Sequence, residues 1–145
     1  MRKLIIIPAY NEEKNLISLI HEINEYLPDY DYIIVNDGSS DKTSLICEEK
    51  KYNAIHLPIN LGIGAAVQTG YLYAIENGYD IAIQIDGDGQ HDPSHLYDLV
   101  NPLEDGTIDF VIGSRFLHKL GFRSTFARRI GIAILSSIVY MLTRK

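Results

Sequence analysis

The chain has 145 residues, of which 46% are hydrophobic and 22% are charged, and its formal net charge is -6. This length and balance indicate one globular domain with a substantial core and exclude a disordered chain. The negative charge argues against a general nucleic-acid binder. A single cysteine, Cys47, excludes an internal disulfide framework. Because there is neither a signal peptide nor a glycosylation sequon, we expect a cytoplasmic location.

Short apolar runs alternate along the chain with amphipathic segments, a pattern typical of strands followed by helices. We expect strands at 3–7, 32–35, 54–57, 81–85 and 110–113. We expect helices at 11–27, 41–51, 60–77 and 93–101, and one more from residue 124 onward. This alternation predicts an α/β fold with a largely parallel sheet covered by helices.

Local signals predict where several of these elements begin and end. Pro8 should stop the first strand, and Asn11 is a good N-cap for the helix that follows, with Glu12 and Glu13 in its first turn. Ser40 or Asp41 can cap the second helix, and Gly78 is typical of the residue just past the end of a helix.

Polar clusters follow the first, second, fourth and fifth predicted strands. They are 8–13, Asp37, the pair Asp86 and Asp88, and Arg115. In open parallel sheets, ligands bind beyond the carboxyl ends of the strands. We therefore expect these clusters to share one edge of the sheet and to form one site.

Asp86 and Asp88 are the strongest candidates for metal ligands. They directly follow a buried apolar run and are separated by glycine, which leaves room for a polyanion to approach the backbone. Hard oxygen ligands suit Mg²⁺ or Mn²⁺ bridging to a diphosphate, because such ions take only one or two carboxylates from the protein. A plain Asp-Gly turn is the alternative interpretation of the octapeptide by itself.

The C-terminal part of the chain is basic. No acidic residue follows Asp109, whereas several arginines and lysines do, which suggests an anionic partner such as a lipid phosphate or a membrane surface. A solvated basic tail is the alternative. The apolar run 130–142 is shorter than the roughly 20 residues that span a bilayer, so it is expected either to lie in the membrane interface or to pack on the domain. We expect a catalytic domain at 1–123 and a basic amphipathic helix at 124–145 that begins a longer segment.

Five motifs occur in one order along the chain. They are Pro8-Ala9-Tyr10-Asn11-Glu12-Glu13, Asn36-Asp37-Gly38-Ser39-Ser40-Asp41, Asn60-Leu61-Gly62-Ile63-Gly64-Ala65-Ala66, Asp86-Gly87-Asp88-Gly89-Gln90-His91 and Gly113-Ser114-Arg115. Together they resemble family 2 glycosyltransferases of the GT-A fold, most of all the branch with dolichyl-phosphate mannosyltransferase and bacterial polyprenyl-phosphate glycosyltransferases. The resemblance covers nearly the whole chain and implies a Rossmann-like α/β/α sandwich with a mainly parallel central sheet.

The resemblance implies roles on the donor side of the site. The motif residues Pro8, Tyr10 and Glu12 would hold the base and ribose of the nucleotide, and Asp37 would read the nucleobase, which points to a UDP- or GDP-linked sugar. A further donor-site candidate is the glycine of the third motif, Gly64.

The same resemblance implies the metal and acceptor residues. Asp86, Asp88 and Gln90 would hold Mg²⁺ or Mn²⁺, and Arg115 would contact the diphosphate and the phosphate of the acceptor. Arg129 would be the second acceptor arginine, with Arg128 as its rival. Two departures weaken the acceptor assignment: Ala133 replaces the usual serine, and the family's later segment is absent.

The expected activity is inverting transfer of a sugar from a nucleotide-diphosphate sugar to an acceptor, with Asp88 and Arg115 as the catalytic residues. The chain has no late aspartate to serve as a general base. A lipid phosphate is already anionic and needs no strong base, so a polyprenyl phosphate is the expected acceptor. We expect the protein at the inner face of the cytoplasmic membrane, with peripheral contact through the C-terminal helix.

Several alternatives compete with this hypothesis. A Rossmann dehydrogenase fits poorly, because the third glycine of its motif would fall at Val67 and the motif follows the third strand instead of the first. A phosphatase would form a covalent phosphoaspartate, and a nucleotidyltransferase would release or consume pyrophosphate. The strongest competitor from outside the enzymes is a binding module for nucleotide sugar or lipid phosphate that performs no turnover.

Overall fold

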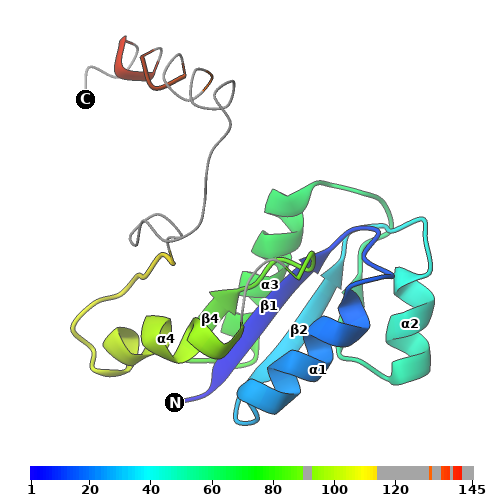
Figure 1. The fold of residues 1–145 in the computed structure, drawn as a ribbon, viewed down its shortest axis with the longest axis horizontal. Helices are drawn as coiled ribbons and strands as arrows, with labels where there is room; N and C mark the ends of the chain where they lie inside the picture. The colour runs from blue at the N-terminus through cyan, green and yellow to red at the C-terminus, as the bar shows by residue number, and fades with distance from the viewer. Residues whose placement is uncertain (90–92, 114–130, 132–134, 138, 142–145) are drawn as a thin grey trace. The chain divides into compact units, whose positions relative to one another are not determined.

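The computed structural model describes residues 1–89, 93–113, 131, 135–137 and 139–141, and the chain divides into two compact units, Met1–Val111 and Ile112–Lys145. The first unit contains the sheet and its helices (Figure 1). In chain order its elements are β1 (Lys3–Ala9), α1 (Leu16–Tyr26), β2 (Asp31–Asn36), α2 (Thr43–Lys50), β3 (Ala54–His56), α3 (Ile63–Glu76), β4 (Ile81–Gln84), the 3-10 helix η1 (Pro93–His95) and α4 (Leu96–Glu104).

The four strands form one parallel sheet in the order β3-β2-β1-β4. The central strand β1 pairs with β2 on one side and with β4 on the other, so that Ile6 stands between Ile33 and Gln84. This confirms the α/β class and the parallel sheet that the alternating pattern predicted.

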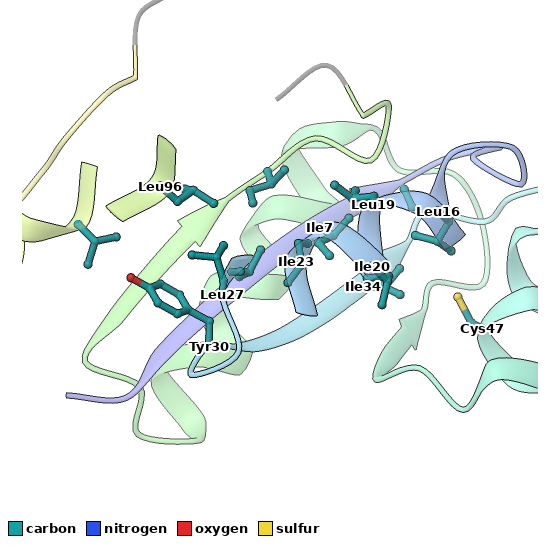
Figure 2. Packing of buried hydrophobic residues seen from close by; sticks show 14 of the residues in the cluster. Ile7, Leu16, Leu19, Ile20, Ile23, Leu27, Tyr30, Ile34, Cys47 and Leu96 are labelled. Atoms are coloured by element: carbon teal, nitrogen blue, oxygen red, sulfur yellow. The ribbon is translucent and has the colours of Figure 1, made fainter. Parts of the chain in front are cut away.

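Side chains of β1 alternate between the two faces of the sheet, as the pleat of a strand requires. Ile5 and Ile7 belong to the cluster that packs against α1 and α4, whereas Leu4 and Ile6 belong to the cluster beneath α3. Figure 2 shows the first cluster, in which Ile7 lies among the buried leucines and isoleucines of α1. Because both faces of β1 are covered, the strand is apolar and buried from Leu4 to Ala9.

The order in which strands are added to the sheet reverses after β3, although all four strands are parallel. The helices α1 and α2 contribute to the core on one face while the chain moves outward from β1 to β3. The helix α3 then crosses the opposite face and brings β4 to the free side of β1. Right-handed crossovers in opposite directions must use opposite faces, so the gap between β1 and β4 is a topological switch point.

The only cysteine of the chain, Cys47, lies on α2 with 1% of its surface exposed (Figure 2). Burial, with a smaller contribution from the neighbouring Glu48 carboxylate, raises the pKa of the Cys47 thiol above its ordinary value. A buried thiol of this kind packs like a small apolar side chain.

Three element boundaries differ from the predictions. The helix α1 begins at Leu16, not next to Asn11, and Asn11 adopts a left-handed backbone with φ of 59°. The strand β1 continues through Pro8 to Ala9, because Pro8 loses only a donor while its carbonyl still accepts from Gly87 N at 3.3 Å. The helix predicted from residue 93 starts as η1 and extends to Glu104.

The predicted fifth strand at 110–113 was wrong. These residues form no strand, and Phe110 and Ile112 are 74% and 72% exposed. A strand requires a partner edge as well as an apolar sequence. Within the described part of the chain, no strand pairs with the outer edge of β4.

In the second unit, the described positions 131, 135–137 and 139–141 are helical, in agreement with the predicted last helix. None of the helices within the described residues is long and apolar enough to cross a membrane. The predicted boundary between 123 and 124 lies outside the described residues.

The close contact between α3 and β1 generates a prediction about stability. A Cβ atom on Gly70 would lie 2.2 Å from Cγ2 of the fully buried Ile6. We expect Gly70→Ala to lower the free energy of unfolding by roughly 1 to 3 kcal/mol through overpacking, despite the higher helix propensity of alanine. Urea unfolding of the two proteins measures the difference. Gln68→Ala, an exposed position on the same helix, is the control, and an unchanged or higher stability of Gly70→Ala would contradict the prediction.

Candidate functional site

A cavity of about 280 Å³ lies beyond the carboxyl ends of β1, β2 and β4, at the switch point of the sheet. Its lining comes from the segments that follow these three strands and from the start of α3. The lining residues are Pro8, Ala9, Tyr10, Glu12, Asp37, Asn60, Gly62, Ile63, Ala66, Asp86, Gly87 and Asp88. The predicted convergence of polar clusters on one edge is therefore observed for three of the four strands.

Most of the predicted donor-site and metal residues are brought together here. Those that line the cavity are Pro8, Tyr10, Glu12, Asp37, Asp86 and Asp88, whereas Gly64 does not line it. Four other candidates, Gln90, Arg115, Arg128 and Arg129, lie outside the described residues. Three further lining residues were not predicted as site residues: Asn60, Gly62 and Ile63. They belong to the third motif, and their proximity to Asp37 could have been inferred from the parallel topology.

Gly87 brings the aspartate pair close to the end of β1. A Cβ atom at this position would lie 3.0 Å from the carbonyl oxygen of Pro8 and 3.3 Å from Cγ of Glu12. Glycine therefore allows the segment after β4 to lie flat against the segment after β1. In consequence, Asp86 and Asp88 share a cavity with Tyr10 and Glu12.

The cavity is strongly acidic. The carboxylates of Glu12, Asp37, Asp86 and Asp88 line it, and no lysine, arginine or histidine does so within the described part of the chain. Asp86 is half-buried and accepts a hydrogen bond from Gln84 Nε2 at 2.9 Å, whereas Asp88 is exposed. An anionic ligand would need a cation to enter such a field.

The donor set fits Mg²⁺ or Mn²⁺. Among the residues that the structure describes, no three histidine, cysteine or acidic side chains are grouped as a ready metal site. Asp86 and Asp88 nevertheless present two hard carboxylate ligands in one cavity. Ions of this kind commonly take one or two carboxylates from the protein and the remaining ligands from waters and substrate phosphates.

Asp37 binds the loop that leads into α3. It is only 3% exposed, and its two carboxylate oxygens accept hydrogen bonds from the backbone N–H groups of Leu61 and Gly62, each at 2.8 Å. Hydrogen bonds from donors to an ionised acceptor are among the stronger ones in proteins. Asp37 therefore fixes one wall of the cavity, and its predicted contact with a nucleobase stays a prediction.

Gly38 allows this loop to lie against the turn after β2. It has a left-handed backbone with φ of +64°, and a Cβ atom there would lie 2.6 Å from the backbone nitrogen of Asn60. Any side chain at this position would therefore push the loop away from Asp37. The turn itself is held by buried Asn36, whose Oδ1 accepts from Ser39 N at 3.1 Å and whose Nδ2 contacts His56 Nδ1 at 3.0 Å.

Asp41 connects the turn after β2 with the segment after β1. Its Oδ1 accepts hydrogen bonds from the hydroxyl and the backbone N–H of Thr43 at 2.6 and 2.9 Å, and its Oδ2 accepts from Glu13 N at 3.1 Å. Burial by itself raises the pKa of the Asp41 carboxyl, but the hydrogen bonds from Thr43 and Glu13 outweigh it and lower this pKa below its ordinary value. The sequence predicted Ser40 or Asp41 as the N-cap of the second helix, but the N-cap of α2 is Lys42; Asp41, one residue earlier, accepts from the first helical residue, Thr43.

The chain matches a known protein family and is similar to several known proteins. The profile of the family described as Glycosyl transferase family 2 matches residues 4–143. The polyprenol monophosphomannose synthase of Mycolicibacterium smegmatis is 32% identical over 122 residues, which are 80% of this chain and 46% of that protein. The UDP-N-acetylglucosamine–dolichyl-phosphate N-acetylglucosaminyltransferase of Methanococcus voltae is 35% identical over 157 residues, which are 95% of this chain and 62% of that protein. The chain therefore spans about half the length of these relatives.

A solved structure is similar in fold. The glucosyl-3-phosphoglycerate synthase of Mycobacterium tuberculosis, in complex with Mn²⁺, UDP and glucosyl-3-phosphoglycerate, matches with a TM-score of 0.57 at 24% identity. The match covers 70% of this chain and 39% of that one. This similarity confirms the predicted GT-A fold.

The contacts of Asp37 predict a stability effect at the cavity wall. In Asp37→Asn, the new amide NH₂ would face one of the two N–H donors, so we expect the free energy of unfolding to fall by roughly 1 to 3 kcal/mol. Hydrogen exchange should become faster at the amide that faces the new NH₂, Leu61 above all, because Gly62 N also donates to Asn60 Oδ1 at 3.0 Å. The control is Asp29→Asn, an exposed carboxylate that precedes β2. Unchanged hydrogen exchange at both amides would contradict the proposed role of Asp37 in holding the loop.

The lowered pKa of Asp41 predicts how stability responds to acid. The Asp41 carboxylate has a lower pKa in the folded state than in the unfolded chain, so its contribution is present above the unfolded value of about 3.9. That contribution is lost as the pH falls through the folded value. We expect the wild-type chain to be more stable than Asp41→Asn at pH 7, and this difference to shrink below about pH 4. Urea unfolding at a series of pH values measures both, and a constant difference would refute the assignment.

Proposed function

Because the chain belongs to glycosyl transferase family 2, we propose that it forms the donor-binding part of an inverting glycosyltransferase. The donor would be a UDP- or GDP-linked sugar and the acceptor a polyprenyl phosphate. The observation that carries this proposal is the gathering of Tyr10, Glu12 and Asp37 with Asp86 and Asp88 in one cavity at the switch point of the sheet.

The two ends of a nucleotide would contact different residues of the cavity. Tyr10 is 47% exposed and presents an aromatic side chain beside Pro8 and Glu12, which suits a base and ribose. Asp37 already accepts two backbone hydrogen bonds, and carboxylate lone pairs remain for a base N–H. Asp86 and Asp88 on the neighbouring segment would then face the diphosphate.

Mg²⁺ or Mn²⁺, when bound, would neutralise the diphosphate and stabilise it as a leaving group. Asp88, Asp86 and Gln90 would hold this ion. The neighbouring carboxylates make the ion necessary, because two anions would otherwise repel each other in the same cavity. The complex of the Mycobacterium tuberculosis synthase with Mn²⁺ and UDP supports a divalent ion as a cofactor.

The transfer itself would be a single displacement. An oxygen of the acceptor phosphate would form a bond to the anomeric carbon while the bond from that carbon to the diphosphate oxygen breaks, which inverts the configuration. Arg115 would orient the acceptor and add positive charge, and Arg129 or Arg128 would hold its phosphate. The polyprenol and dolichyl-phosphate named for the two relatives support a lipid acceptor.

Such an acceptor places the reaction at a membrane surface. We assign the donor site to residues 1–123 and peripheral contact with the inner face of the cytoplasmic membrane to the basic segment 124–145, which the sequence predicts to be an amphipathic helix. Its arginines and lysines would be attracted to anionic headgroups, by about 1 kcal/mol for each charge near the surface. This role in the cell envelope rests on the lipid-linked names of the relatives.

Calorimetric titration of the 145-residue chain with UDP, GDP and their sugar conjugates tests the donor site. We expect one nucleotide to bind in the presence of Mn²⁺, and Asp88→Asn to weaken that binding at least about tenfold, or 1.4 kcal/mol. The matched control is Asp98→Asn, an exposed carboxylate on α4 that does not line the cavity.

Transfer of the sugar to a polyprenyl phosphate, measured with the same nucleotide sugar, tests the activity. Binding without any transfer would favour the non-catalytic binding module. Equal binding by wild type and Asp88→Asn, or binding that ignores Mn²⁺, would contradict the assignment of the aspartate pair.

A further inference from the structure

We propose that Asn11 is a positioning residue of the donor site. It connects the segment after β1 to the turn after β2 and thereby holds Tyr10 and Glu12 in place along the cavity. Asn11 does not itself line the cavity, so it would act through its two neighbours. The inference rests on the proposed function, because it assumes that this cavity binds a nucleotide.

The backbone of Asn11 adopts an uncommon conformation for a residue with a side chain. Its φ of 59° lies in the left-handed region, which asparagine tolerates better than most residues that carry a Cβ atom. The residue is exposed, so burial of its side chain does not explain this conformation. The left-handed residue turns the chain sharply between Tyr10 and Glu12, which are the two cavity residues on either side of it.

The hydrogen bonds of Asn11 join the segment after β1 to the turn after β2. Its backbone N–H donates to Ser39 Oγ at 2.9 Å, and its side-chain Oδ1 accepts from Ser40 N at 2.9 Å and from Asp41 N at 3.3 Å. One residue thus satisfies backbone groups on both segments. These contacts join positions that are 28 to 30 residues apart in the sequence.

The next two residues extend the same connection. Glu12 N donates to Thr43 Oγ1 at 2.9 Å, and Glu13 N donates to Asp41 Oδ2 at 3.1 Å. In return, Lys42 N donates to Glu13 Oε2 at 3.1 Å. Three successive backbone donors after Tyr10 therefore end on side chains of the turn after β2 and of the first residue of α2, and Asn11 is the member nearest to Tyr10.

The position of the Tyr10 side chain depends on the contacts of Asn11. The tyrosine is 47% exposed and belongs to neither apolar cluster, so the core does not hold its side chain. Its direction depends on the backbone, which the contacts of Asn11 anchor one residue later. Loss of these contacts would let the Tyr10–Glu12 segment move relative to Asp37 while the sheet stays folded.

Two substitutions at this position separate the side chain from the backbone. Asn11→Gly keeps the left-handed conformation and removes the Oδ1 acceptor, whereas Asn11→Asp keeps an acceptor in a residue that also tolerates this conformation. The measurement is calorimetric affinity for UDP and GDP with Mn²⁺, together with thermal unfolding of each protein. We expect roughly tenfold weaker binding for Asn11→Gly and a change within about threefold for Asn11→Asp.

Tyr79→Phe is the matched control for stability. It removes the hydrogen bond from Tyr79 Oη to Asp31 Oδ2 at 2.9 Å, at the start of β2 and away from the cavity. We expect a lower melting temperature and an unchanged nucleotide affinity for this variant. If Asn11→Gly likewise lowers only the melting temperature and binds the nucleotide as wild type does, Asn11 is merely structural and the inference is overturned.

Failure of the two proposals gives different results. If the wild-type chain binds a nucleotide and Asn11→Gly binds it equally well, only the positioning role is overturned. If the wild-type chain binds neither UDP nor GDP, the donor site is overturned and the positioning role with it.

Discussion

The pairing of β1 on both of its edges is the constraint on which the rest of this structure depends. A strand with hydrogen-bonded neighbours on both sides and helices on both faces must be apolar along its length, and β1 is buried from Leu4 to Ala9. Its carboxyl end is the point where the crossovers on either side diverge. The space for a ligand therefore follows from strand order, and the chain needs only to place suitable side chains at that end.

Above this apolar base, the site is built from polar contacts between loops. Asp37, Asn11 and Asp41 each accept hydrogen bonds from backbone N–H groups of another segment. Backbone donors in irregular segments require partners, and side-chain oxygens supply them where strand pairing ends. The motifs thus contain two kinds of polar residue. Some would contact a ligand, and their neighbours in the sequence hold the loops together.

The sequence predicted the first four strands, because apolar periodicity is a local property, and the shared edge, because the carboxyl ends of parallel strands lie at the same edge of a sheet whatever their order. It misplaced Asn11, because an asparagine before a helix and an asparagine in a left-handed bend look alike until their partners, here Ser39 to Asp41, are known. It also predicted a strand at 110–113 from composition, although pairing depends on an edge elsewhere in the chain. The parallel topology implies that Asp37 lies near residues 60–63, but not that its two oxygens accept from Leu61 N and Gly62 N, because that depends on the conformation of the loop.

The burial of Cys47 has a practical consequence for experiments on this chain. The thiol is the only one present, lies on the buried side of α2, and has a raised pKa, so little reactive thiolate is available while the fold is intact. Maleimide or a similar reagent would react with it chiefly when α2 separates from the sheet. Reaction of Cys47 would therefore report the separation of α2 from the sheet. A second cysteine added at an exposed position could carry a fluorophore, because Cys47 would react little with the dye in the folded protein.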